Sequence, residues 1–207
     1  MRTAHRKVGE NYGSVFELLN AKSLHELVQK GDIPLTDILT QYTELLKQVH
    51  GTRFEIGELP SYRVRFLDYI NVIKGCLSDG QEQQLKKLLV DMPEDNTVVH
   101  GDIHMKNVMM VDNEPMLIDM DTLGLGNPVF DLAGVYVTYQ MFEEDDPDNS
   151  MDFLGMTNEM VDEIWNSIMD SYFDFRDCEE KKKITDRIVH AVSHIEELLK
   201  TVTQISI

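Results

Sequence analysis

Residues 98–134 have the sequence VVHGDIHMKNVMMVDNEPMLIDMDTLGLGNPVFDLAG, and this stretch decides the fold. Two apolar runs, at residues 108–111 and 116–118, are separated by the turn-forming tetrad Asp-Asn-Glu-Pro, which predicts a β-hairpin. Asp102 and Asn107 then lie on the polar loop before the hairpin, and Asp119 lies where its second strand stops. Side chains at such positions are exposed on a rigid base.

These three side chains together suit metal-assisted phosphoryl transfer. That reaction needs a carboxylate to orient and deprotonate the acceptor hydroxyl, and oxygen ligands to hold Mg²⁺ against the phosphates. Asp102 suits the first task, and Asn107 and Asp119 suit the second. The alternative is that all three are turn residues bonded to their own backbone. A turn role readily explains any one of these three residues. It explains their combination on a loop flanked by two predicted strands less well.

The same segment resembles the catalytic and metal-binding region of the aminoglycoside phosphotransferase and choline kinase family, small-molecule kinases related in fold to protein kinases. The elements that match in order and spacing are His100-Gly101-Asp102, Asn107, Leu117-Ile118-Asp119 and Asp131-Leu132-Ala133. The resemblance implies that Asp102 is the catalytic base and that Asn107 and Asp119 bind Mg²⁺. It also implies that His100 and Asp131 brace the catalytic loop.

His104 lies two residues after the expected base. Protein kinases place a lysine near the transferred phosphate at this position, so the resemblance gives His104 a catalytic role in contacting phosphate. The alternative is that His104 only packs, and the sequence does not decide between the two.

A second match covers residues 12–26. It is similar to the last strand of the family's small lobe and the hinge that follows it, which implies that backbone groups of Glu17, Leu18 and Leu19 bind the adenine of ATP or GTP. Independently of the resemblance, Ser23-x-x-Glu26 is a capping box, which predicts that a helix begins here.

A kinase of this type also needs a Gly-rich loop over the phosphates and a strand lysine before the hinge. None of the 12 glycines forms such a loop, and neither Lys7 nor Lys22 follows a predicted strand. We therefore expect residues 1–20 to be a remnant of the small-lobe strand and hinge, with most of the small lobe missing. Residues 21–207 are expected to form the helical catalytic lobe.

Elsewhere the sequence predicts helices. Apolar residues spaced by three and four follow Pro34 and recur over residues 184–202, and each pattern predicts a helix with one buried face. Further helices are expected at residues 62–77, 81–90 and 161–172, and after Pro128. The expected fold class is α+β and mostly α, a protein kinase-like large lobe with short β-hairpins at the active site.

The chain carries 19 basic and 37 acidic side chains, a formal charge of −18. That charge argues against nucleic acid as a partner and favours a cationic acceptor. The densest acidic run, residues 142–148, is expected to be a solvated loop tip. No apolar run reaches the ~20 residues of a membrane span, and two cysteines form no disulfide framework, so a cytoplasmic location is expected.

Two hypotheses of different classes follow. The first is an ATP-dependent small-molecule kinase that phosphorylates a hydroxyl of a small acceptor such as an aminoglycoside or amino alcohol. The second is a non-catalytic kinase-like module that binds nucleotide or a protein partner. In either case the strand at residues 14–19 would have an unpaired edge, which favours a homo-oligomer or a partner chain that covers it.

Overall fold

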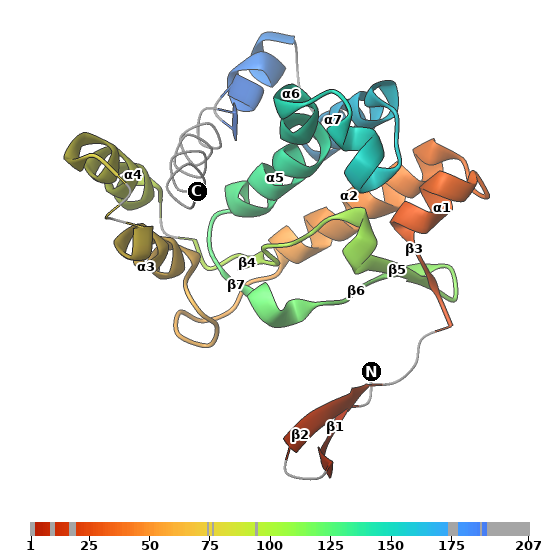
Figure 1. Ribbon diagram of the computed structural model, residues 1–207, viewed down its shortest axis with the longest axis horizontal. Coiled ribbons are helices and arrows are strands. Elements are labelled where there is room, and N and C mark those ends of the chain that lie inside the picture. Colours follow the sequence, from red (N-terminus) through yellow and green to blue (C-terminus); the bar gives the residue numbers. More distant parts are fainter. Residues whose placement is uncertain are drawn as a thin grey trace.

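The computed structural model describes residues 3–8, 11–16, 20–73, 75, 77–93, 95–173, 178–186 and 188–189. These residues form a helical lobe with small antiparallel sheets, and the hairpin of β1 and β2 projects away from the lobe (Figure 1). The predicted fold class, mostly helical α+β with short β-hairpins, is confirmed.

The described helices are α1 (Leu24–Lys30), α2 (Leu35–Gly51), α3 (Tyr62–Ile73), α4 (Asp79–Asp91), α5 (Val129–Tyr136), α6 (Phe142–Asp145) and α7 (Asn158–Phe173). The described strands are β1 (Thr3–Val8), β2 (Asn11–Phe16), β3 (Lys22–Ser23), β4 (Val98–Val99), β5 (Val108–Val111), β6 (Glu114–Leu117) and β7 (Gly124–Leu125). Residues 178–186 are also helical.

The predicted hairpin is formed by β5 and β6, with Val108 opposite Leu117. Its turn consists of Asp112 and Asn113, whose φ angles are 51° and 66°. Two successive positive φ angles are typical of two-residue hairpin turns, and Asp and Asn tolerate them better than most residues. The short strands β3 and β4 pair with β5 and β7 respectively, so both ends of the 100–107 loop are anchored in sheets.

The main core is built around α2. The stripe predicted after Pro34 is confirmed, because Ile38, Leu39, Tyr42 and Leu46 are buried. These side chains pack with buried residues of α1, α5 and α7 in one cluster. Full burial of each such side chain contributes on the order of 1.5–3 kcal/mol.

A second, smaller apolar cluster lies between α3 and α4, which correspond to the helices predicted at residues 62–77 and 81–90. Its buried residues are Ile70, Leu85 and Leu89, and Phe130 of α5 packs against them. Phe130 therefore connects the α3–α4 pair to the lobe.

The helix predicted at Ser23 is α1, and its capping box is formed as expected. The Glu26 amide donates to Ser23 Oγ at 3.2 Å, and the Ser23 amide donates to Glu26 Oε2 at 3.0 Å. The helix ends at Gly31, whose φ of 65° lies in the left-handed region that favours glycine. This turn holds α1 directly after β3, which pairs with the hairpin strand β5.

Two expectations differ from the structure. Lys7 lies on a strand, β1, opposite Tyr12, although no strand was expected before residue 14. The acidic run at residues 142–148 begins as helix α6 rather than a loop tip. It is flanked by π-helical turns at Val137–Met141 and Ser150–Leu154, which apolar spacing alone does not distinguish from α-helix. The helix predicted at 184–202 lies mostly outside the described residues.

No helix within the described part of the chain combines the length and the hydropathy that a bilayer-crossing segment requires.

Candidate active site

Asp102 projects from the loop between β4 and β5, and its side chain is 47% exposed. The Asn107 side chain holds it in place, because Nδ2 donates to both the backbone oxygen and Oδ2 of Asp102, each at 2.9 Å. His104 Nε2 lies 3.3 Å from the other carboxylate oxygen, Oδ1. A carboxylate fixed in this way, yet open to solvent, can accept a hydrogen bond from an approaching hydroxyl.

Asn107 and Asp119 are brought together by the hairpin. The Ile118 amide donates to the Asn107 carbonyl at 3.0 Å, one step beyond the Val108–Leu117 pair. Asp119 follows directly and is exposed, with φ 59° and ψ 63° in the left-handed region. Few residues other than glycine adopt this conformation, although Asp and Asn do so more often than most.

The three predicted ligand and base residues therefore converge at one edge of the lobe. Asn107 is buried and uses Nδ2 for its hydrogen bonds, while no hydrogen bond among the described residues goes to its Oδ1. Oδ1 and the Asp119 carboxylate are hard oxygen donors of the kind that Mg²⁺ prefers. No group of three His, Cys, Asp or Glu side chains in the described part of the chain could hold a metal ion by itself.

His100 connects the loop to the end of β6. Its ring is fully buried, and Nδ1 accepts from the Asp102 amide at 3.3 Å. The ring proton therefore belongs on Nε2, which donates to the Ile118 carbonyl at 3.1 Å. One side chain thus bonds to the residue that carries the predicted base and to the residue before Asp119.

Asp131 lies beneath the same loop, on the first turn of α5. Its carboxylate accepts from the amides of His100 at 2.9 Å and Gly101 at 2.6 Å. It also accepts from His50 Nε2 at 3.0 Å, and both side chains of this pair are buried. The carboxylate therefore fixes the backbone immediately before Asp102.

His50, on α2, was not anticipated as part of this network. Burial, followed by the charge of Asp131, raises the pKa of Tyr172 to about 12, so the Tyr172 hydroxyl keeps its proton. It donates to His50 Nδ1 at 2.7 Å, and Nε2 then carries the proton that is donated to Asp131. The available signal was position, since His50 follows Leu46 by four residues on the buried stripe of α2.

The imidazole of His104 lies beside Asp102. Burial lowers the pKa of His104 below its usual 6.5, an effect that the Asp102 charge partly offsets. Burial also lowers the pKa of His25, on α1, and Lys106 and His104 lower it further. Lys106 is exposed and donates to the Phe153 carbonyl at 2.9 Å.

Only part of the segment expected to bind the nucleotide lies within the described residues. Glu17, Leu18 and Leu19 lie outside the described residues. Lys22, on β3, pairs with Asp32 at 3.0 Å.

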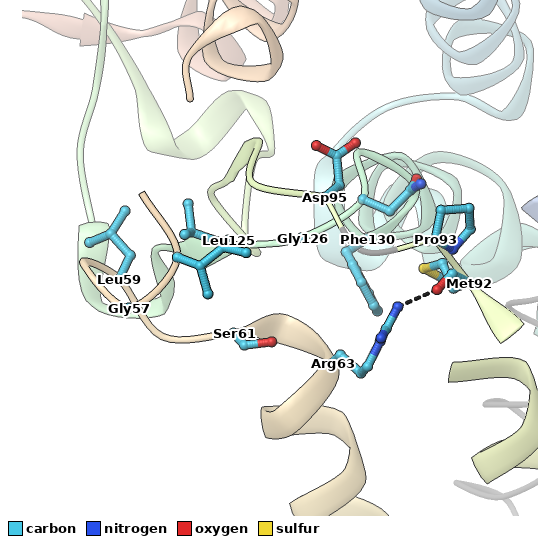
Figure 2. A pocket seen from close by; sticks show the side chains of 12 residues that line it. Gly57, Leu59, Ser61, Arg63, Met92, Pro93, Asp95, Leu125, Gly126 and Phe130 are labelled. Carbon is cyan, nitrogen blue, oxygen red and sulfur yellow. Dashed lines mark hydrogen bonds between the residues drawn. The ribbon is translucent and has the colours of Figure 1, made fainter. Parts of the chain in front are cut away.

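A pocket of about 60 Å³ lies near the site, between the start of α3 and the start of α5 (Figure 2). Its lining includes Ser61, Arg63, Gly126 and Phe130, and Arg63 hydrogen-bonds the Met92 carbonyl across it. Ligand pockets usually measure ~300–1,000 Å³, and no predicted site residue lines this one. We therefore do not assign the acceptor to it.

Residues 4–154 match the model of the phosphotransferase enzyme family. Among solved structures, the chain is similar to a choline/ethanolamine kinase family protein from Mesorhizobium loti, with a TM-score of 0.52 and 16% identity. That alignment covers 97% of this chain and 63% of the other. An ethanolamine kinase from Plasmodium vivax aligns with a TM-score of 0.52 and 13% identity, and that alignment covers 93% of this chain and 57% of the other. No curated protein sequence matches the chain.

A further solved structure, an aminoglycoside phosphotransferase mutant in a ternary complex with ADP and hygromycin B, aligns with a TM-score of 0.45 and 15% identity. That alignment covers 93% of this chain and 76% of the other. The chain spans about three fifths of the length of the two kinases with the higher scores. The kinase-like fold of the lobe is shared with those two proteins.

The Asp131 network leads to a prediction about stability. Asp131→Asn should lower the free energy of unfolding by roughly 3 kcal/mol. The NH₂ group of asparagine would face at least one of the three donors that now bond to the carboxylate, and that donor would lose its acceptor. Asp119→Asn is the matched control and should change it by less than about 0.5 kcal/mol, since the carboxylate is exposed. Urea unfolding measures both, and equal losses in the two variants would contradict the network's role.

Proposed function

The chain belongs to the phosphotransferase enzyme family, and on that premise we propose that it transfers the γ-phosphate of ATP to a hydroxyl of a small acceptor. One observation carries the proposal: the solvent-accessible carboxylate of Asp102 is oriented by the Asn107 side chain. Asn107 is in turn bonded through its backbone to Ile118, the residue before Asp119. Positioning and electrostatic stabilisation are most of what phosphoryl transfer asks of a protein.

In the proposed reaction Asp102 is the base. Its carboxylate accepts a hydrogen bond from the acceptor hydroxyl and takes up the proton as the new oxygen–phosphorus bond forms. The bond between the γ-phosphorus and the bridging oxygen breaks in the same step, and ADP leaves with that oxygen. Asn107 holds the carboxylate throughout, through the bond from Nδ2 to Oδ2.

Asn107 Oδ1 and Asp119 are the proposed ligands of Mg²⁺. They supply one neutral and one charged oxygen, and phosphate oxygens and water would complete the octahedron that Mg²⁺ requires. When bound, Mg²⁺ neutralises charge on the phosphates. His100 and Asp131 act on this site through the backbone, since they hydrogen-bond the loop and the end of β6.

The role of His104 has the same two alternatives as before. The ring of His104 lies beside Asp102, with Nε2 3.3 Å from the carboxylate. A phosphate that reacts next to this base would therefore be within reach of a hydrogen bond from the ring. Packing remains the other role, because the ring is partly buried.

Nucleotide binding is proposed to involve the hinge at residues 17–19, with ATP or GTP as the donor. In this scheme residues 1–20 form the small-lobe strand and hinge, and residues 21–207 form the catalytic lobe. The two cysteines lack the spacing of a disulfide framework, which supports a cytoplasmic location.

For the acceptor we propose a small cationic molecule such as an amino alcohol or an aminoglycoside. The formal charge of −18 would attract such a molecule. At α6, burial and then the carboxylates of Asp162, Glu159 and Glu144 raise the pKa of Glu143. Two of the structurally similar proteins are named as choline/ethanolamine and ethanolamine kinases, which agrees with an amino alcohol.

The second candidate function is a non-catalytic module that binds nucleotide or a protein partner. It is favoured by the hairpin of β1 and β2, which pair with each other and with no other described strand. Strand edges left open in this way are templates for pairing with another chain.

The proposed base gives a direct test. Asp102→Asn should reduce turnover by ~10²- to 10⁴-fold, the usual contribution of a positioned base, while circular dichroism stays unchanged. Asp112→Asn, at a hairpin-turn position that Asn tolerates, is the control and should keep full activity. ADP formation from ATP and Mg²⁺ with a panel of amino alcohols and aminoglycosides is the measurement. Full turnover in Asp102→Asn would exclude its role as the base.

The open hairpin gives a test of association. Sedimentation at tens of micromolar should detect a self-associated species, and replacing residues 3–8 and 11–16 by polar linker should convert it to monomer. A wild-type chain that sediments as a clean monomer would argue against pairing through this hairpin.

A further inference from the structure

Tyr62, the first residue of α3, fills the space beside three glycines of the 98–134 stretch. It is 3% exposed. A Cβ atom on Gly101 would lie 1.5 Å from the Tyr62 hydroxyl oxygen, and one on Gly124 would lie 2.9 Å from its ring. A Cβ on Gly126 would lie 2.8 Å from the Tyr62 Cβ. No side chain larger than hydrogen is compatible with Tyr62 at these positions, so the glycines and the tyrosine form one packing unit.

The Tyr62 hydroxyl is directed at the turn that follows Asp119. It donates to the Thr122 carbonyl at 2.8 Å, and Thr122 Oγ1 donates to the His100 carbonyl at 2.6 Å. Burial raises the pKa of Tyr62 to about 12, so the hydroxyl is a proton donor near neutral pH. The chain of bonds therefore runs from α3 through the turn to the residue two before Asp102.

Arg65 reinforces the same turn from the next position along the inner face of α3. Its guanidinium donates to the carbonyls of Thr122 and Leu123. It also stacks over the Tyr62 ring, 4.7 Å from the centroid, in a cation–π contact. Two side chains of one helix thus donate to consecutive carbonyls at the end of the 3₁₀ turn Met120–Thr122.

The turn needs such support because Asp119, directly before it, has a left-handed backbone conformation. A non-glycine residue in this region is strained and persists only where the surroundings fix it. No hydrogen bond of the Asp119 side chain is found among the described residues, so restraint must come from its neighbours. On one side that restraint is the β5–β6 pairing, and on the other it is the pair Tyr62 and Arg65.

We propose that Tyr62 and Arg65 are positioning residues, which hold the turn after Asp119 against the loop that carries Asp102 and so set the separation of the two carboxylates. This inference rests on the proposed phosphotransferase function and adds to it residues from outside the 98–134 stretch. It also gives the α3–α4 pair a part in the site, beyond its own small core. Residues that orient metal ligands without contacting the metal themselves typically contribute 10- to 100-fold to metal affinity or activity.

The test compares Tyr62→Phe and Arg65→Met with Tyr69→Phe, a matched control on the exposed face of α3. In the metal-free protein, hydrogen–deuterium exchange of residues 119–123 should accelerate several-fold in the first two variants and stay unchanged in the control. The affinity for Mn²⁺ in the presence of ADP, measured by electron paramagnetic resonance, should fall ~10-fold in the same two variants. Arg65→Lys, which keeps a donor, should recover part of the loss.

The outcomes separate this inference from the proposed function. Wild-type protein that binds no Mn²⁺ with ADP would count against the proposed function, and the exchange measurement would still decide whether the turn is held by Tyr62 and Arg65. Wild-type protein that binds, together with unchanged exchange and affinity in Tyr62→Phe and Arg65→Met, would overturn the inference. A loss of global stability with unchanged exchange at 119–123 and unchanged affinity would overturn it as well, because it would indicate packing alone.

Discussion

The buried carboxylate of Asp131 accepts hydrogen bonds from the amides of His100 and Gly101 and from the ring of His50. A charge this deep in the lobe is tolerated only because each donor is matched to it. The three donors come from the loop that carries Asp102 and from α2, while the acceptor comes from α5. The loop backbone before Asp102 is therefore fixed by the same interaction that joins two helices of the core.

The remaining geometry follows from this constraint and from one hairpin. With His100 held, its ring reaches from the Asp102 amide to the Ile118 carbonyl, which relates the loop to the end of β6. The pairing of β5 with β6, continued by the bond from the Ile118 amide to the Asn107 carbonyl, relates Asn107 to Asp119 through the backbone. The site is thus assembled mainly by hydrogen bonds to backbone groups, and the side chains of Asp102 and Asp119 remain exposed.

Much of this arrangement could be predicted from the sequence, because it depends on local patterns. The capping box at Ser23, the buried stripe of α2 and the turn between β5 and β6 each involve residues close together in the chain. The order and spacing of the 98–134 stretch were enough to indicate the family, and that resemblance is confirmed.

The parts that were missed depend on contacts between distant residues. His50 lies 81 positions from Asp131, and Tyr62 lies 60 positions from Thr122. Local periodicity reports only that such side chains face inward, and it does not identify their partners. The need for glycine at positions 124 and 126 has the same origin, since the Tyr62 side chain that a Cβ would meet there comes from α3.

The central claim is that Asn107 and Asp119 hold a metal ion that is required for nucleotide binding. Calorimetric titration of the chain with ATP, with and without Mg²⁺, tests it most directly when Asp119→Ala is titrated in parallel. Binding is expected to require Mg²⁺ and to be lost in the variant. Binding that is independent of Mg²⁺, or that is unchanged in Asp119→Ala, would contradict it.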